Sequence, residues 1–226
     1  MNERDTSPPE WVDQLQATLE SFDEAGGHRI LGQVFEQLDV EDGLTEVVLP
    51  YLHQVGQRWE DGKIGVAQEH FASGVLRVRL SMMLHGERSA AGPVAVLACM
   101  PGEQHEFGLM GLALVLSRLG WQVRYLGANT PTPEIAYTAR TLRPRAVVLS
   151  AHRRTAFAAH GPAVRRLGKV TEVHIAGPGA TDELAALCEA RLVLGNPVDG
   201  ARALHASAVL SGTLVGSLPG LADEVG

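Results

Sequence analysis

The sequence predicts a two-part α/β protein: an N-terminal four-helix bundle, then a flavodoxin- or Rossmann-like, doubly wound parallel sheet of five strands. Between residues 10 and 88, apolar residues recur at helical spacing with short connections, which is typical of a bundle. From residue 93 onward, short apolar runs alternate with helical patterns, which is typical of a parallel sheet covered by helices. Small and helix-breaking residues, Ser89-Ala90-Ala91-Gly92-Pro93, mark the boundary between the two parts.

The bundle is expected over residues 10–88, after a polar, disordered lead over residues 1–9. Four apolar helical periods follow one another in this region. We expect Gly26-Gly27 to end the first helix, because glycine is common just past a helix C-terminus. Asp61-Gly62 interrupts the pattern again, as a turn would, and separates the third helix from the fourth.

The sheet domain is expected over residues 93–215, followed by a tail over residues 216–226. Ligands of such sheets bind beyond the carboxyl ends of the strands, so the residues that follow each strand are the first candidates for a site. The predicted strands are 93–99, 121–127, 145–150, 171–176 and 191–194, and the predicted helices lie near 106–119, 132–142, 155–168, 180–189 and 198–211.

Composition excludes several functional classes. The net charge is −7, and there are only two lysines beside 17 arginines, which argues against a general binder of nucleic acid. No window of 18 apolar residues is free of charge, so no membrane span is predicted. The polar start lacks a secretory signal, and two cysteines are too few for a disulfide framework. We therefore expect a cytoplasmic protein.

Three features follow the predicted strands. His105 lies on a loop after the first strand, Ser150 closes the third, and Gly177-Pro178-Gly179 follows the fourth. Imidazole is the commonest metal ligand in proteins, and the carboxylate of Glu103 can hold its second nitrogen. Each feature alone is commonly a solvated loop, a helix cap or a turn. Together they predict a slot with a metal-competent nitrogen at its mouth and small residues along its depth.

The pattern Glu103-x-His105-x-x-Gly108 resembles the signature of base-off, His-on cobalamin-binding domains. In that family a serine follows after 41 residues, and 41 residues separate Gly108 from Ser150 here. The later glycine region matches Gly177-Pro178-Gly179 with a proline inserted. One departure is His152, which stands where the family has an apolar residue.

The resemblance implies a role for each of these positions. His105 would be the lower axial cobalt ligand, and Glu103 would orient its imidazole. Soft transition metals accept imidazole, and a carboxylate partner fixes its tautomer. The other implied contacts come from small residues: Gly108 beside the nucleotide tail, Ser150 at the buried base, and Gly177 and Gly179 along the slot.

A second pattern lies in the bundle, where nine residues separate Trp59 from Glu69-His70. It resembles the bundle of light-dependent, MerR-type cobalamin repressors. The resemblance implies that Trp59 stacks against the upper cobalt ligand, with Glu69 and His70 offering polar contacts at that face. Two departures matter. No room precedes the bundle for a MerR-type DNA-binding domain, so direct DNA binding is not expected, and Glu60 replaces the histidine that follows this tryptophan in some repressors.

A sensor with this bundle pattern but without that histidine resembles the photocobilins, which bind cobalamin together with biliverdin. The implied function is a non-enzymatic light sensor that carries adenosylcobalamin and, in the photocobilin reading, biliverdin. Photolysis of the upper cobalt–carbon bond would shift the bundle against the sheet domain. The output would be a change in the assembly of a homodimer or in the binding of a separate effector protein.

Two other readings stay open. One is a corrinoid methyl-carrier subunit of a methyltransferase system, which has the same two-part layout and the same histidine chemistry. The Trp59 pattern disfavours it, because a carrier needs an open upper face. The other is a cobalamin-sensing adaptor that responds to the cofactor and not to light.

Overall fold

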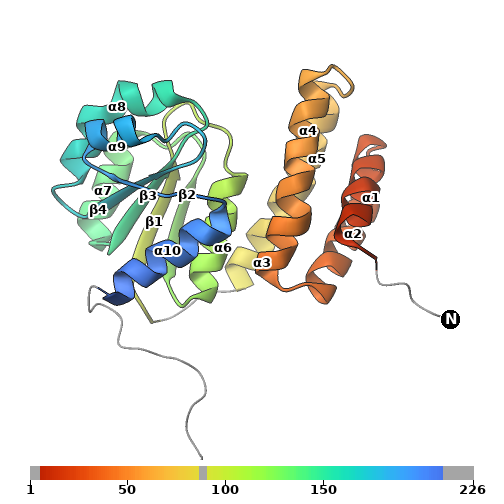
Figure 1. Cartoon of the computed structure of the whole chain (residues 1–226), viewed down its shortest axis with the longest axis horizontal. Helices are drawn as coiled ribbons and strands as arrows, with labels where there is room; N and C mark the ends of the chain where they lie inside the picture. The colour runs from red at the N-terminus through yellow and green to blue at the C-terminus, as the bar shows by residue number, and fades with distance from the viewer. Residues whose placement is uncertain (1–5, 87–90, 211–226) are drawn as a thin grey trace, which may run out of the picture.

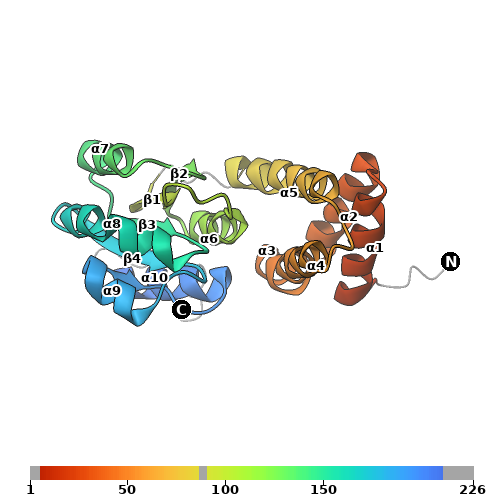
Figure 2. The same cartoon turned by 90° about the horizontal axis from the view of Figure 1, so that it is seen from above.

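The computed structural model describes residues 6–86 and 91–210 of the chain. An N-terminal helical bundle stands beside a sheet domain covered by helices, as Figure 1 and, from above, Figure 2 show. The predicted two-part α/β fold is confirmed. The first five residues of the predicted lead and the predicted tail over residues 216–226 lie outside the described residues. No helix in the described ranges is both long and apolar enough to span a membrane.

Four helical segments form the bundle, and the third contains a π-helical turn. The helices α3, η1 and α4 follow one another without a gap in the chain. They correspond to the third predicted helix, whose regular α-helical turns are interrupted by the π-helical segment η1. Asp39 begins this segment, since its Oδ1 accepts a hydrogen bond of 2.9 Å from the backbone N–H of Asp42. The bounds are α1 Pro8–Glu20, α2 Glu24–Gln37, α3 Val40–Asp42, η1 Gly43–Val48, α4 Leu49–Glu60 and α5 Val66–Gly86.

The expectation that Gly26-Gly27 ends the first helix is wrong, because α1 ends earlier and both glycines lie inside α2. Asp23 caps α2 by accepting a hydrogen bond of 2.8 Å from the backbone N–H of Gly26. A Cβ atom at Gly27 would lie 2.6 Å from a methyl group of Leu19 in α1. These glycines therefore serve the close contact between α1 and α2.

The sheet domain has five parallel strands in the order β2-β1-β3-β4-β5. Each strand and each helix begins within two residues of its predicted position, and the last strand is shorter than expected. Parallel strands bring their carboxyl ends to one edge, which is where the candidate residues gather. The bounds are β1 Val94–Cys99, α6 Phe107–Arg118, β2 Gln122–Gly127, α7 Thr132–Leu142, β3 Ala146–Ser150, α8 Arg154–Leu167, β4 Glu172–Ala176, α9 Asp182–Cys188, β5 Arg191–Leu192 and α10 Pro197–Leu210.

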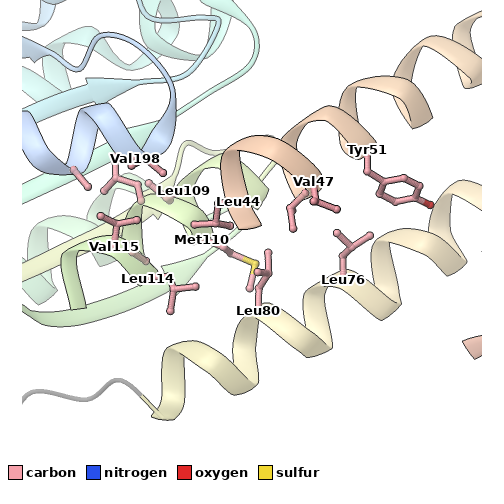
Figure 3. Close-up of a cluster of buried hydrophobic side chains, with 14 of the residues drawn as sticks. Leu44, Val47, Tyr51, Leu76, Leu80, Leu109, Met110, Leu114, Val115 and Val198 are labelled. Atoms are coloured by element: carbon pink, nitrogen blue, oxygen red, sulfur yellow. The ribbon is translucent and has the colours of Figure 1, made fainter. Parts of the chain in front are cut away.

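The two faces of the sheet belong to two hydrophobic clusters. In β1, Leu97 packs into a cluster with α6, α10 and the bundle, whereas its neighbour Val96 packs into a cluster with α7, α8 and α9. The first cluster runs without interruption from the sheet through α6 into the bundle. Figure 3 shows Leu44 and Leu80 of the bundle beside Met110 of α6. The two parts of the chain therefore share one core.

A charged cluster lies at the amino ends of β3, β4 and β5. The carboxylate of Glu172 forms ion pairs with Arg145 at 2.6 Å and with Arg191 at 2.7 Å. Its Oε1 also lies 3.0 Å from Nε2 of His174. His174 is a buried residue of β4. Burial lowers the pKa of His174, and the neighbouring carboxylate of Glu172 only partly offsets this effect. His174 is therefore held neutral in the folded protein.

The neutral state of His174 predicts a loss of stability in acid. An unfolded histidine takes up a proton below about pH 6.5, and folded His174 does so only at lower pH. Its contribution to the free energy of unfolding is complete above that value and declines as the pH falls toward the folded pKa. In urea unfolding at about pH 7 and pH 5, His174→Gln should lose less stability than the wild type. An equal loss in both proteins would contradict this assignment.

Candidate functional site

The loop after β1 is organised by the carboxylate of Glu103, which is 4% exposed. Its Oε1 accepts a hydrogen bond of 2.9 Å from the backbone N–H of His105 and lies 2.5 Å from Nδ1 of the same residue. Its Oε2 accepts a hydrogen bond of 2.6 Å from the backbone N–H of His152, which follows β3. One buried side chain therefore fixes the loop, aligns the imidazole and joins the ends of two strands.

The hydrogen bonds to Glu103 keep it ionised. Burial opposes the charged form, but the backbone N–H groups of His105 and His152, together with the His105 side chain, outweigh burial and lower the pKa of Glu103 to about 2. A carboxylate beside Nδ1 favours the tautomer in which Nδ1 carries the proton and Nε2 carries the lone pair. The His105 side chain is 64% exposed, so a nitrogen that can bind a metal ion is accessible from outside the protein.

The structure adds His152 to the site. Its ring stacks on the ring of His105 with a centroid separation of 4.6 Å and an interplanar angle of 29°. The sequence showed His152 only as a departure from a family pattern. Its contact with His105 depends on the neighbouring positions of β1 and β3 in the sheet, which spacing alone did not reveal.

Ser150 and the two predicted glycines lie against one another at the carboxyl ends of β3 and β4. Ser150 is buried. A Cβ atom at Gly177, whose φ is +89°, would lie 2.7 Å from the backbone oxygen of Ala151 and 3.1 Å from Oγ of Ser150. A Cβ atom at Gly179 would lie 2.7 Å from the backbone of Arg153. The glycines therefore allow the loop after β4 to approach the end of β3 more closely than a side chain would permit.

Gly108 and the bundle residues occupy other parts of the same region. Gly108 is exposed near the start of α6, and a Cβ atom there would make only an ordinary contact with Pro197. Trp59 lies at the end of α4 with 50% of its surface exposed. Glu69 and His70 lie near the start of α5, and Glu69 accepts a hydrogen bond of 2.7 Å from Ser73.

The bundle residues and the His105 loop lie at the same end of the molecule. In Figure 1 the connection between α4 and α5 and the carboxyl ends of the strands are both at the top. Within the described ranges, no hydrogen bond, ion pair or ring contact joins Trp59, Glu69 or His70 to His105. The structure thus places both predicted groups on one side of the molecule without direct contact between them.

Sequence reasoning missed a second buried carboxylate next to His105. The Glu106 side chain is 9% exposed; its Oε1 lies 2.6 Å from Nε of Arg77 in α5, and its Oε2 accepts a hydrogen bond of 2.9 Å from the Tyr125 hydroxyl in β2. The Arg77 guanidinium also lies 5.5 Å from the ring centre of Phe107. No local sequence signal relates Arg77 to Glu106, because their contact crosses the boundary between the two parts.

Both halves of the chain match family models described as B12 binding domain, one over residues 11–83 and the other over residues 93–193. The first match covers the bundle, and the second covers most of the sheet domain and contains His105 and its loop. Both halves are B12-binding domains. This identification confirms the cobalamin-binding part of the resemblance deduced from the sequence.

Individual relatives include two transcriptional repressors and a corrinoid protein. The B12-binding chain is 38% identical to the HTH-type transcriptional repressor CarH of Myxococcus xanthus over 62% of this chain and 47% of that protein. It is 35% identical to the HTH-type transcriptional repressor CarA of the same organism over 64% of this chain and 51% of that protein. The chain spans about half the length of the curated relatives it matches. A solved monomethylamine corrinoid protein of Methanosarcina barkeri shares the fold, with a TM-score of 0.73 and 16% identity over 89% of this chain and 100% of that chain.

The close contact at Gly177 predicts a specific loss of stability in this B12-binding domain. Gly177→Ala forces a side chain into a left-handed backbone and against Ala151, and should lower the free energy of unfolding by about 1–3 kcal/mol in urea titrations. The matched control is Gly56→Ala in α4, where a Cβ atom meets nothing within 4 Å. That change should stabilise the protein by about 0.5–1 kcal/mol. Equal effects at both positions would contradict the contact.

Proposed function

We propose that this protein is a non-enzymatic, cobalamin-dependent light sensor. When bound, cobalamin would supply absorption of visible light and a light-sensitive cobalt–carbon bond, with adenosyl as the upper ligand. The observation that carries the proposal is that Trp59 at the end of α4 and Glu69-His70 at the start of α5 lie at the same end of the molecule as His105. A single exposed aromatic side chain is ordinary on a protein surface, so the shared position of the two groups, and not the exposure of Trp59 alone, supports a ligand at that end.

The donor set on the sheet domain fits a cofactor that needs one axial ligand. The described residues contain no group of three or more His, Cys, Asp or Glu side chains that could hold a metal ion by themselves. A single exposed imidazole with a fixed tautomer suits a metal whose other positions are filled by a macrocycle. In the proposal His105 provides Nε2, Glu103 orients the ring, and Ser150 receives the displaced base.

The glycines lie at the same edge of the sheet. Gly177 and Gly179 let the loop after β4 pack against the backbone of Ala151 and Arg153 beside Ser150, and in the proposal the displaced base would lie along this loop. Gly108 is exposed and leaves room for a nucleotide tail beside α6. At the opposite face of the cofactor, Trp59, Glu69 and His70 would contact the upper ligand.

The bundle residues provide the response. Loss of a bulky group beside Trp59 would remove an interaction that favours one position of the bundle, and a ligand shifts a conformational equilibrium only through such a difference. The repressor relatives support a regulatory output. We propose that the output is a changed assembly of a homodimer or changed binding of a separate effector protein.

The experiment compares dark and illuminated protein. The purified chain is loaded with adenosylcobalamin in the dark, and absorption spectra and size-exclusion profiles with light scattering are recorded before and after illumination. The sensor should show a spectral change faster than that of free cofactor, together with a shift in mass. The hydroxocobalamin-loaded protein, which has no cobalt–carbon bond, should show neither. Methyl transfer with a partner enzyme, or photochemistry no faster than that of free cofactor with no change in assembly, would argue against the sensor.

Biliverdin provides a separate arm of the same experiment. The photocobilin resemblance predicts that a titration with biliverdin in the dark gives a saturable spectral shift in the cobalamin-loaded protein. No shift would remove the bilin from the proposal and leave the cobalamin sensor intact.

His105 and its partner can be tested directly. Glu103→Gln keeps the shape of the side chain but removes its charge, and should weaken hydroxocobalamin binding about 10–100-fold in absorbance titrations. His105→Ala should also change the spectrum of the bound cofactor, because the lower ligand is lost. Gln104→Ala, an exposed position in the same loop, is the control and should bind normally. An unchanged spectrum in His105→Ala would refute the ligand assignment.

The role of Trp59 has its own test. Trp59→Ala should change the rate or yield of photolysis of the adenosylcobalamin-loaded protein, since the upper ligand loses its aromatic neighbour. Tyr137→Ala removes another exposed aromatic ring, from α7 in the sheet domain, and should leave photolysis unchanged. The same photolysis in both variants and the wild type would exclude Trp59 from the upper face.

A further inference from the structure

Glu106 is held by both parts of the protein at once. Its Oε1 contacts Arg77 of the bundle at 2.6 Å, and its Oε2 accepts a hydrogen bond of 2.9 Å from Tyr125 of the sheet. Both carboxylate oxygens are therefore occupied by partners from different halves of the chain. Because the side chain is almost fully buried, loss of the Arg77 cation would leave a buried negative charge without compensation.

Glu106 lies directly beside His105 in the chain, so its contact with Arg77 bears on the His105 loop. It is joined by a peptide bond to His105, and it precedes the first residue of α6. The loop 103–106 is fixed at one end by Glu103, which is bound to the end of β3, and at the other end by Glu106, which is bound to the bundle. A displacement of α5 that exceeds the reach of the Arg77 side chain either breaks the Arg77 contact or moves the residue next to the imidazole.

The contact also lies next to the apolar boundary between the two parts. Leu80, one turn beyond Arg77 in α5, and Met110, one turn beyond Glu106 in α6, belong to one buried cluster (Figure 3). An apolar contact between helices tolerates small shifts, whereas an ion pair with defined oxygen partners has a preferred geometry. The geometry of the Arg77–Glu106 ion pair is therefore sensitive to the position of the bundle relative to the loop that carries His105.

We propose that the Arg77–Glu106 ion pair couples the position of the bundle to the affinity of the His105 site for cobalamin. The inference rests on the proposed role of His105 as the cobalt ligand. Coupling of this kind is reciprocal: if the docked bundle strengthens cobalamin binding, bound cobalamin strengthens docking by the same factor. Arg77 and Glu106 are positioning residues in this scheme, since neither needs to touch the cofactor.

The test measures cobalamin affinity and bundle position in the dark. Arg77→Gln, Glu106→Gln and the double variant are titrated with hydroxocobalamin by absorbance. In parallel, spin labels at Gln57→Cys in the bundle and Arg140→Cys in α7, both exposed positions, report the distance between the two parts by pulsed electron resonance. Cys99 and Cys188 are buried, so labelling is directed to the introduced thiols.

The proposal predicts a defined pattern of results. Each single variant should bind hydroxocobalamin about tenfold more weakly, within the usual range of coupling between sites, and should broaden the distance distribution of the cofactor-free chain. The double variant should be no weaker than either single variant, because the two side chains act through one contact. Arg77→Lys, which keeps the charge, should recover part of the affinity.

Arg58→Gln is the matched control. Nε of Arg58 contacts Oε1 of Glu20 at the same 2.6 Å, and Nη2 of Arg58 donates a second hydrogen bond of 3.1 Å to Oε2, but both residues belong to the bundle. Its loss should lower thermal stability without changing cobalamin affinity or the label distance. An equal loss of affinity in Arg58→Gln would show a general effect of stability and overturn the proposal.

Other outcomes also decide the matter. Wild-type affinity and an unchanged distance distribution in Arg77→Gln would overturn the proposal, as would additive effects of Arg77→Gln and Glu106→Gln. If Glu106→Gln does not fold, the comparison of Arg77→Gln with Arg77→Lys decides, because Arg77 is half exposed. Since the measurement uses no light, a failed light response counts against the sensor function and leaves this coupling to be judged by its own data.

Discussion

The carboxylate of Glu103 is the interaction on which the rest of the candidate site depends. It is buried, it stays ionised, and it accepts hydrogen bonds from the backbone and ring of His105 and from the backbone of His152. A buried charge is tolerated only when its hydrogen-bonding capacity is filled. The folded loop meets this requirement by orienting the exposed imidazole, so the stability of the loop and the orientation of the imidazole have one cause.

The shared hydrophobic core links this loop to the bundle. Helix α6 is apolar around most of its circumference, and its buried residues contact the sheet, α10 and the bundle. Such a helix has no solvent face of its own and needs cover on all sides. The bundle supplies the part of this cover that the sheet and α10 leave open, so the two B12-binding domains share one hydrophobic core at their boundary.

The sequence predicted the alternation of strands and helices closely, because apolar periodicity and turn residues act locally. Through the resemblance to the cobalamin-binding signature it also proposed His105, Glu103, Ser150 and the glycines as candidate site residues, and the structure places them at one edge of the sheet. It missed what depends on tertiary contact. Gly26-Gly27 resembles a helix terminus but serves a helix crossing, and the Arg77–Glu106 pair joins residues 29 positions apart across the boundary. The stacking of His152 on His105 likewise follows from neighbouring strands.

The π-helical turn over Gly43–Val48 has a consequence for the face that α4 presents. A helix advances by about 100° per residue, and a π turn accommodates one extra residue within an otherwise regular helix. The segment that follows, including Trp59 at its end, takes its angular setting from that extra residue. Removal of one residue from this π-helical segment would rotate α4 about its axis by about a quarter turn. The direction in which the Trp59 side chain points is therefore determined by a segment that lies more than two helical turns earlier in the chain.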